Sequence, residues 1–255
     1  MWKMTWIQLM NRWRSNVWVC VELLLAFCLA WYMVDYFFVE IYNRSLPSGR
    51  DYTNVWQVEM GLLPETSPSI AMLENYERIK DRLRDYPGVK AMGAASGCYS
   101  MPYTGCYYGM GLADVADTSK REAAMTYTIY PSTDFPSVFN HSYAKDGRAV
   151  SISDFDWGDP HAILTTRMVE RKVFGEASAV GRGVKDPFDE EGPTYIVKGV
   201  LEDIKRFDNR LPQGAAFFAI RPSVEEIPEM NYFIRIDPAV AGPRFADTFR
   251  EKMSR

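Results

Sequence analysis

Hydrophobic residues run almost without interruption from Val17 to Val39, and this is the strongest pattern in the chain. Only Glu22 and Asp35 are ionisable within the stretch. A helix of this length reaches about 34 Å, enough to cross a hydrocarbon core of about 30 Å. Bulky side chains such as Trp31 occupy the place where a cleaved signal peptide needs small ones. The pattern therefore predicts an uncleaved transmembrane helix over residues 17–39.

The charges flanking this helix predict its orientation. Three basic residues precede it, namely Lys3, Arg12 and Arg14. The positive-inside rule then places the N-terminus in the cytoplasm and residues 40–255 on the opposite side, as a single-pass protein. Within residues 1–16, an apolar stripe at helical spacing predicts a helix in the membrane interface, and a simple extension of the span is equally compatible. The stripe comprises Trp2, Trp6, Leu9 and Trp13.

Beyond a short polar linker at residues 45–51, strand and helix patterns alternate. We expect a helix at 69–86, ended by Pro87-Gly88, and a second at 168–174, followed by Gly175 in a left-handed C-cap. A third helix begins at 245 and runs to 253. The expected strands are 52–60, 89–96, 124–130, 149–153, 162–165, 195–201, 215–220 and 232–236, with a turn at 134–139. This order predicts an α+β fold that contains ferredoxin-like βαβ units.

Charge and cysteine content narrow the function classes. Residues 40–255 carry 26 basic and 31 acidic residues, a net charge of −5, which gives no electrostatic case for a nucleic-acid partner. Cys20 and Cys28 lie within the apolar span and serve there as apolar side chains. Cys98 and Cys106 lie outside it, in a turn-rich segment. An oxidising compartment would let them form a disulfide, but the spacing alone leaves this open.

No motif for catalysis, a cofactor or a metal is present in the sequence. The glycines from Gly175 to Gly183 lack the spacing and the Lys-Ser/Thr of a phosphate-binding loop. His141 and His161 have no Cys or carboxylate at metal-ligand spacing, so we interpret both as non-ligands. Glu22 makes membrane insertion of the helix less favourable, because a charged side chain inside a span costs about 2.5–3.5 kcal/mol of insertion free energy. Either it reaches the cytoplasmic interface or is protonated, or it contacts a partner helix within the membrane.

Several short motifs follow one another along the second part of the chain. They are Asp85-Tyr-Pro87-Gly88-Val89, Gly147-Arg148 with Asp154, Phe174-Gly175, Val180-Gly181-Arg182, and Tyr195 to Lys205 with Gly199 and Asp203. In this order and spacing they resemble the MacB-like periplasmic core domain of FtsX-like ABC-transporter permeases, of the type found in Bacteroidetes. The resemblance covers nearly the whole chain.

The resemblance implies a periplasmic domain over residues 45–255. One subdomain would combine residues 51–98 with 232–255, and a second, residues 107–222, would be inserted between them. Permeases of this type continue with a last strand and three further spans, so we expect this chain to be truncated after the periplasmic domain.

The resemblance also implies a location and a set of partners. The chain would lie in the bacterial inner membrane and perform no covalent chemistry. The implied partners are an ABC ATPase subunit that hydrolyses ATP in the cytoplasm, further permease spans or a second permease copy in a dimer, and a periplasmic adaptor protein. Two other classes remain open from the residues alone, a membrane-anchored periplasmic sensor or binding module and an exoplasmic enzyme.

Overall fold

The computed structural model describes residues 4, 7, 13–58, 70–96, 109–130, 133–155, 159–189, 191–205, 210–219 and 230–253. The chain divides into two units, Met1–Pro47 and Ser48–Arg255, which are described separately. The first unit contains one long helix, α2 (Trp13–Ser45), which extends the predicted segment at both ends. Its part from Val17 to Ser45 has the length and composition of a membrane span, with a mean hydropathy of 2.2 and no buried residue.

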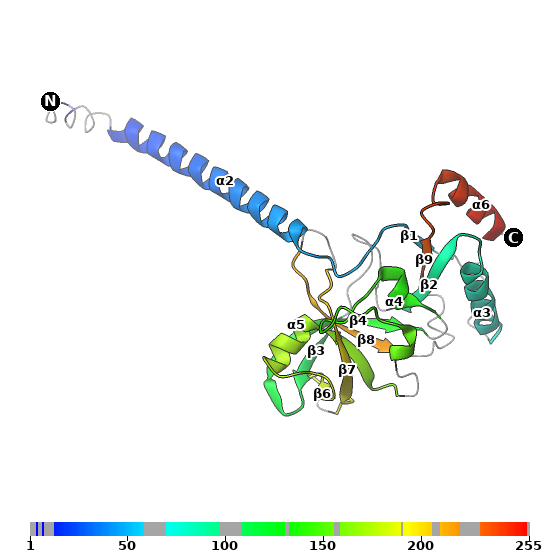
Figure 1. The fold of residues 1–255 in the computed structure, drawn as a ribbon. Helices are drawn as coiled ribbons and strands as arrows, with labels where there is room; N and C mark the ends of the chain where they lie inside the picture. The colour runs from blue at the N-terminus through cyan, green and yellow to red at the C-terminus, as the bar shows by residue number, and fades with distance from the viewer. Residues whose placement is uncertain are drawn as a thin grey trace. The chain divides into compact units, whose positions relative to one another are not determined.

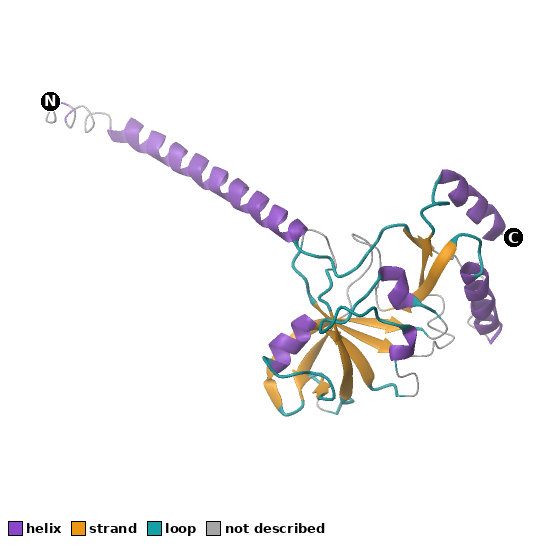
Figure 2. Cartoon of the chain, in the orientation of Figure 1, coloured by secondary structure: helices purple, strands orange, loops and turns teal. Residues whose placement is uncertain are grey.

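The second unit combines helices and strands, which confirms the predicted α+β class (Figure 2). Its strands are β1 (Val55–Val58), β2 (Val89–Ser96), β3 (Gly109–Asp114), β4 (Asp117–Ile129), β5 (Ala162–Thr166), β6 (Gly183–Lys185), β7 (Tyr195–Leu201), β8 (Gly214–Ala219) and β9 (Asn231–Ile236). Its helices are α3 (Ile70–Arg84), α4 (Phe135–Phe139), the 3-10 turn η1 (Ile152–Asp154), α5 (Arg167–Val169), the π-helical turn η2 (Glu170–Phe174) and α6 (Pro243–Met253).

Strand β9 lies between β1 and β2 and is antiparallel to both. The unit β1–α3–β2 therefore leaves a gap that β9 fills, as in the split βαβ arrangement of ferredoxin-like folds. Residues alternate between the two faces of these strands. One face packs against α3 and α6 through Tyr76, Leu83 and Phe249. The other face packs against α4 through Phe135 and Phe139.

The six strands β3 to β8 close into a barrel. The pairing runs β4–β3–β6–β7–β5–β8, and β8 then pairs with β4 in parallel. Figure 1 shows these strands wrapped around a common axis, with α5 at one end. The chain passes from β5 through α5, η2 and β6 to β7, and β5 pairs with β7 in parallel.

One hydrophobic core continues from the barrel to the three-stranded sheet. It contains Phe217 of β8, Tyr127 of β4, Phe135 and Phe139 of α4, and Phe233 of β9. The Phe139 and Phe233 rings are 5.1 Å apart, and the Tyr127 and Phe217 rings are 5.2 Å apart. Because buried aromatic contacts of this kind contribute substantially to stability, the barrel and the sheet are held together by packing as well as by the chain.

The strand predicted at 149–153 is wrong. Ala149 makes only an isolated bridge to Ser142, and the chain then enters η1. The Asp154 carboxylate accepts a hydrogen bond from the Ser151 amide at 2.9 Å, so a capping box satisfies a backbone group that a strand would have paired. The hairpin strand β3 was not predicted, because its glycines at 109 and 111 give no strand pattern.

The helix predicted at 168–174 forms, but as α5 followed by the π-helical turn η2. Gly175 ends it with a φ of +67°, so the predicted positive φ is confirmed. Its ψ of −121° nevertheless lies outside the left-handed helical region, in a conformation accessible to glycine. The remaining predicted strands and helices are present; β4 begins at Asp117, well before the predicted strand at 124–130, and the other boundaries shift by a few residues.

Candidate functional site

A short segment, Ser48–Tyr52, follows the long apolar helix and is inserted into the folded domain. Only Leu46 and Pro47 separate it from the end of α2 at Ser45. We refer to it as the strap. Its central residue, Arg50, is only 6% exposed, although the surrounding sequence is that of a polar linker. Buried arginines are rare unless the guanidinium is satisfied, so the strap is a built contact rather than a loose tether.

The strap attaches to the barrel just after β7. The Lys205 amide donates a hydrogen bond to the Ser48 carbonyl at 2.9 Å, and Arg50 Nη2 donates to the Lys205 carbonyl at 2.5 Å. Ser48 Oγ also hydrogen-bonds the Arg50 carbonyl. Gly49 has a φ of +66°, and a Cβ built there would lie 2.0 Å from the Asp203 carbonyl oxygen. Only glycine fits this close approach of two backbones.

Asp203 connects the same point to the first turn of α5. Its carboxylate accepts a hydrogen bond from the Met168 amide at 2.5 Å and so supplies the helix cap that Thr166 does not provide. Burial raises the pKa of Asp203 above its usual range, against the lowering effects of the Met168 amide and of Arg171. The strap, the end of β7 and the start of α5 therefore meet at Asp203, where the strap approaches the backbone carbonyl and α5 is bonded to the carboxylate.

One residue further along, the strap attaches to β9 and α4. The Asp51 amide donates to the Phe139 carbonyl at 2.9 Å. The Asp51 carboxylate accepts hydrogen bonds from Arg235 Nη1 at 3.0 Å and from Asn140 Nδ2 at 2.9 Å. Arg235 also donates to the Asp51 carbonyl at 2.8 Å and to the Val138 carbonyl at 2.8 Å. Arg235 thus ties strap, α4 and β9 together.

The pKa of Asp51 responds to these contacts. Burial by itself raises it, but hydrogen bonds from Thr53 and the charge of Arg235 bring the pKa below its usual value. The Asp51 carboxylate is therefore ionised at neutral pH and accepts charge-assisted hydrogen bonds.

His141 lies directly beneath the strap. It is 3% exposed, hydrogen-bonds the backbone of Gly49, and its ring is 5.6 Å from that of Phe217. The rings of Phe135 and Phe139 are each 6.0 Å from it. Burial, and secondarily the charge of Arg50, lower the pKa of His141 to about 3. The imidazole is therefore neutral, and it packs as an uncharged side chain against the strap.

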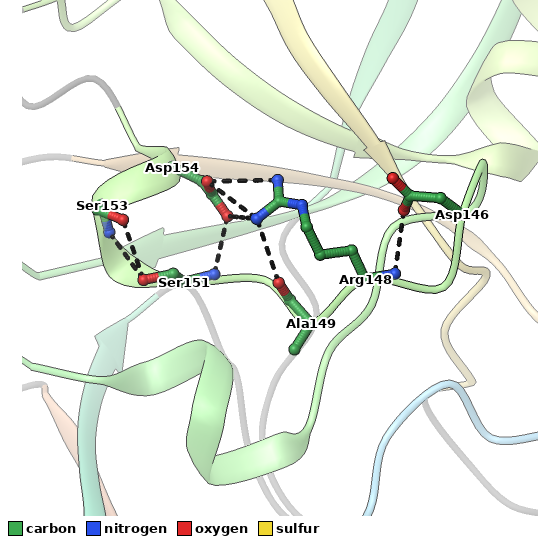
Figure 3. Close-up of polar contacts among 6 residues, drawn as sticks. All are labelled: Asp146, Arg148, Ala149, Ser151, Ser153 and Asp154. Carbon is green, nitrogen blue, oxygen red and sulfur yellow. Dashed lines mark hydrogen bonds and ion pairs between the residues drawn. The ribbon is translucent and has the colours of Figure 1, made fainter.

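The Gly147-Arg148 motif and Asp154 form a second polar cluster, shown in Figure 3. Arg148 Nη1 lies 3.1 Å from Asp154 Oδ2, and its guanidinium lies 4.5 Å from the centre of the Tyr143 ring. The Arg148 amide donates to Asp146 at 3.0 Å. These contacts are internal to the loop and half-exposed, so the cluster fixes the loop between α4 and η1 and has no reactive group directed at a ligand.

A shallow cavity of about 470 Å³ lies on the β3–β4 hairpin. Its lining includes Gly111, Arg121, Asp186 and Phe188, and Phe188 is 76% exposed. The Arg121 guanidinium lies 5.2 Å from the centre of the Phe188 ring. Among the residues described here, no group of three or more His, Cys, Asp or Glu side chains could hold a metal ion.

The candidate residues from the sequence fall in different places. Glu22 lies in α2 and is exposed. Cys98 and Cys106 lie outside the described residues, so their disulfide stays a prediction. Sequence reasoning missed Arg50 and Asp51, which it treated as part of a linker. The one signal in the sequence for a close contact was Gly49 directly before an arginine. Burial of that arginine, however, depends on Lys205, which lies far away in sequence.

No family model and no curated protein sequence matches the chain. Three solved structures are similar to it. A domain of a protein described as a permease, from Porphyromonas gingivalis, shares 16% identity over 69% of this chain and 74% of that chain, with a TM-score of 0.48. The extracellular domain of the noncanonic ABC-type transporter YknZ from Gram-positive bacteria shares 15% identity over 76% and 86%, with a TM-score of 0.44.

The third similar structure is the periplasmic region of MacB from Actinobacillus actinomycetemcomitans. It shares 11% identity over 81% of this chain and 87% of that chain, with a TM-score of 0.45. These are distant similarities. The first two proteins are described as a permease and an ABC-type transporter, and the third is MacB itself.

Proposed function

We propose that the chain is the N-terminal portion of a MacB/FtsX-type ABC-transporter permease in the bacterial inner membrane. In this proposal α2 spans the membrane with its N-terminus in the cytoplasm, and Ser48–Arg255 is periplasmic. A partner ATPase hydrolyses ATP, and the movement of the span changes the conformation of the periplasmic domain for export or extraction of a substrate. Further permease spans or a second copy, and a periplasmic adaptor, complete the assembly.

The observation that carries the proposal is the strap. A flexible tether would let a membrane helix move without consequence for the domain. Here the chain leaving α2 is fixed within six residues to two separate parts of the domain, Lys205 beyond β7 and Arg235 in β9. In the proposal, a displacement of the helix end that passes through Leu46 and Pro47 acts on these contacts. The barrel β3–β8 and the sheet β1–β9–β2 also support the proposed subdomains, residues 107–222 inserted between 51–98 and 232–255.

The first test determines which proteins co-purify with the chain from its native membranes. The tagged full chain, purified in mild detergent from its own membranes, is expected to carry an ABC ATPase with ATP hydrolysis, whereas the chain alone hydrolyses none. Recovery of the chain without any ATPase would instead favour the membrane-anchored periplasmic sensor or binding module.

The second test addresses the coupling. Spin labels on the barrel and on β9 would report the response of the domain to ATP in the complex. Arg50→Met is expected to abolish that response while ATP hydrolysis continues, because the link to the Lys205 carbonyl is lost. Arg148→Met, in the exposed loop cluster, is the matched control and should leave the response intact. An unchanged response in Arg50→Met would exclude the strap as the route of coupling.

A further inference from the structure

Gly49 of the strap lies between the Asp203 backbone and the side chain of His141. The space around Gly49 is full on the Asp203 side, since even a methyl group has no room there. On the other side, the imidazole of His141 fills the position between the Gly49 backbone and the phenylalanine rings below. The Gly49 backbone is therefore in contact with Asp203 on the barrel and with the buried imidazole of His141.

The charged groups around His141 would oppose a positive charge on its ring. Arg50 is the charged side chain that acts on it. The carboxylate of the strap, Asp51, is engaged by Arg235 and Asn140. Phe135, Phe139 and Phe217, whose rings surround the imidazole, carry no charge. A protonated His141 would thus be a buried cation close to the Arg50 guanidinium, which is strongly unfavourable.

We propose that His141 makes the strap an acid-sensitive latch, which is seated at neutral pH and released when the imidazole takes up a proton and leaves its phenylalanine pocket. The latch is a property of the folded domain. Its consequence for transport, loss of coupling in an acidic exoplasmic compartment, rests on the proposed function.

The pH window follows from the two states of the latch. When the strap is released, His141 titrates near its usual 6.5, whereas in the seated state its pKa is about 3. A lowered histidine pKa means that the seated state is favoured above pH 6.5 and loses that advantage as the pH falls towards 3. Between pH 7.5 and 5.0 the ratio of released to seated strap is expected to rise about 30-fold.

Asp203 acts in the opposite direction. Because its pKa is raised in the folded protein, protonation of its carboxyl favours the folded arrangement that holds the strap. The Asp203→Asn variant removes the opposing group and should retain the response.

The test is amide hydrogen exchange of the full chain in detergent micelles, expressed as protection factors corrected for the pH dependence of intrinsic exchange. The Lys205 amide, which bonds the Ser48 carbonyl, reports release of the strap. Its protection is expected to fall about 30-fold between pH 7.5 and 5.0. The Gly181 amide, bonded to the Val197 carbonyl of β7 and to no residue of the strap, is the internal reference and should change little.

The chain offers a matched control, because it has only two histidines. His141→Gln should abolish the pH-dependent loss of protection at Lys205, and His161→Gln, at an exposed position, should retain it. Persistence of the loss in His141→Gln, or no loss in the wild type, overturns the proposal.

Imidazole NMR signals of the wild type provide a measurement that does not depend on folding of the variant. A seated His141 that titrates near 6.5 also overturns the latch. No ATPase is present in either measurement, so failure of the latch and failure of the transport proposal are separate results.

Discussion

Replacing Gly49 by alanine is the sharpest single perturbation of the strap. The residue has a φ of +66°, and its new Cβ would lie 2.0 Å from the Asp203 carbonyl oxygen and 2.9 Å from the carbonyl carbon. Contacts of a real Cβ under 3.0 Å are essentially never seen. Since both neighbours are backbone atoms, no side-chain rotation relieves the clash, and the strap must move away from the barrel.

The expected cost has two parts. An alanine in the left-handed region costs about 1 kcal/mol. Moving the strap also weakens two hydrogen bonds, from the Lys205 amide to Ser48 and from Arg50 to the Lys205 carbonyl, and leaves a buried guanidinium less satisfied. At about 1 kcal/mol for each bond and more for a buried charged donor, Gly49→Ala should lower the free energy of unfolding by about 3–5 kcal/mol.

The Gly147→Ala variant separates the backbone cost from the cost of displacing the strap. Gly147 has a nearly equal φ of +69°, but nothing lies within 4 Å of a Cβ built there. It should therefore show only the backbone cost of about 1 kcal/mol. Urea unfolding of the full chain in detergent, followed by near-ultraviolet circular dichroism, measures both variants. If the two lose the same stability within about 0.5 kcal/mol, close approach of the strap to Asp203 contributes nothing and the reasoning is refuted.

Three further predictions concern other contacts. A double-mutant cycle of Asp51→Asn and Arg235→Met should give a coupling energy of about 1 kcal/mol in urea unfolding. Because the pKa of Asp51 is lowered in the folded protein, this contribution is present above pH 3.8 and disappears as the pH falls through the folded pKa. Phe249→Ala should cost about 3 kcal/mol, whereas the exposed Phe188→Ala should cost under about 0.5 kcal/mol. Glu22→Leu should leave membrane insertion intact; reduced recovery of the ATPase complex would indicate a helix contact at Glu22, and unchanged recovery would indicate none.

Periodicity in the sequence predicted much of the fold because those elements follow local rules. The span was readable from its uninterrupted apolar residues, and α3 from Tyr76 and Leu83 on one face before Pro87-Gly88. The β5–α5–β7 unit was likewise predicted from its pattern. The prediction failed at residues 149–153, because the same backbone groups can pair in a strand or be bonded by side chains. There the capping box of Ser151 and Asp154 forms instead of a strand.

The strap could not be predicted from its own sequence, because the contacts that join it to the domain are distant along the chain. Arg50 meets Lys205, and Asp51 meets Asn140 and Arg235. The interpretation of SLPSGRD as a linker misses the backbone hydrogen bonds of Ser48 and Asp51 to the domain and the burial of Arg50. The position of His141 next to Gly49 likewise depends on how α4 packs against β8 and β9, which its own sequence does not show.

The strap has consecutive residues attached to different parts of the domain. Arg50 holds the barrel at Lys205, and Asp51 holds β9 at Arg235. Because one peptide bond separates the two attachments, a pull on the strap cannot reach the barrel without reaching the sheet. The shared core around Phe139 and Phe233 resists separation of the two parts. At neutral pH the barrel and the sheet should therefore move as one body. Under the proposed function, release of the strap, rather than bending between barrel and sheet, is the step at which coupling would be lost.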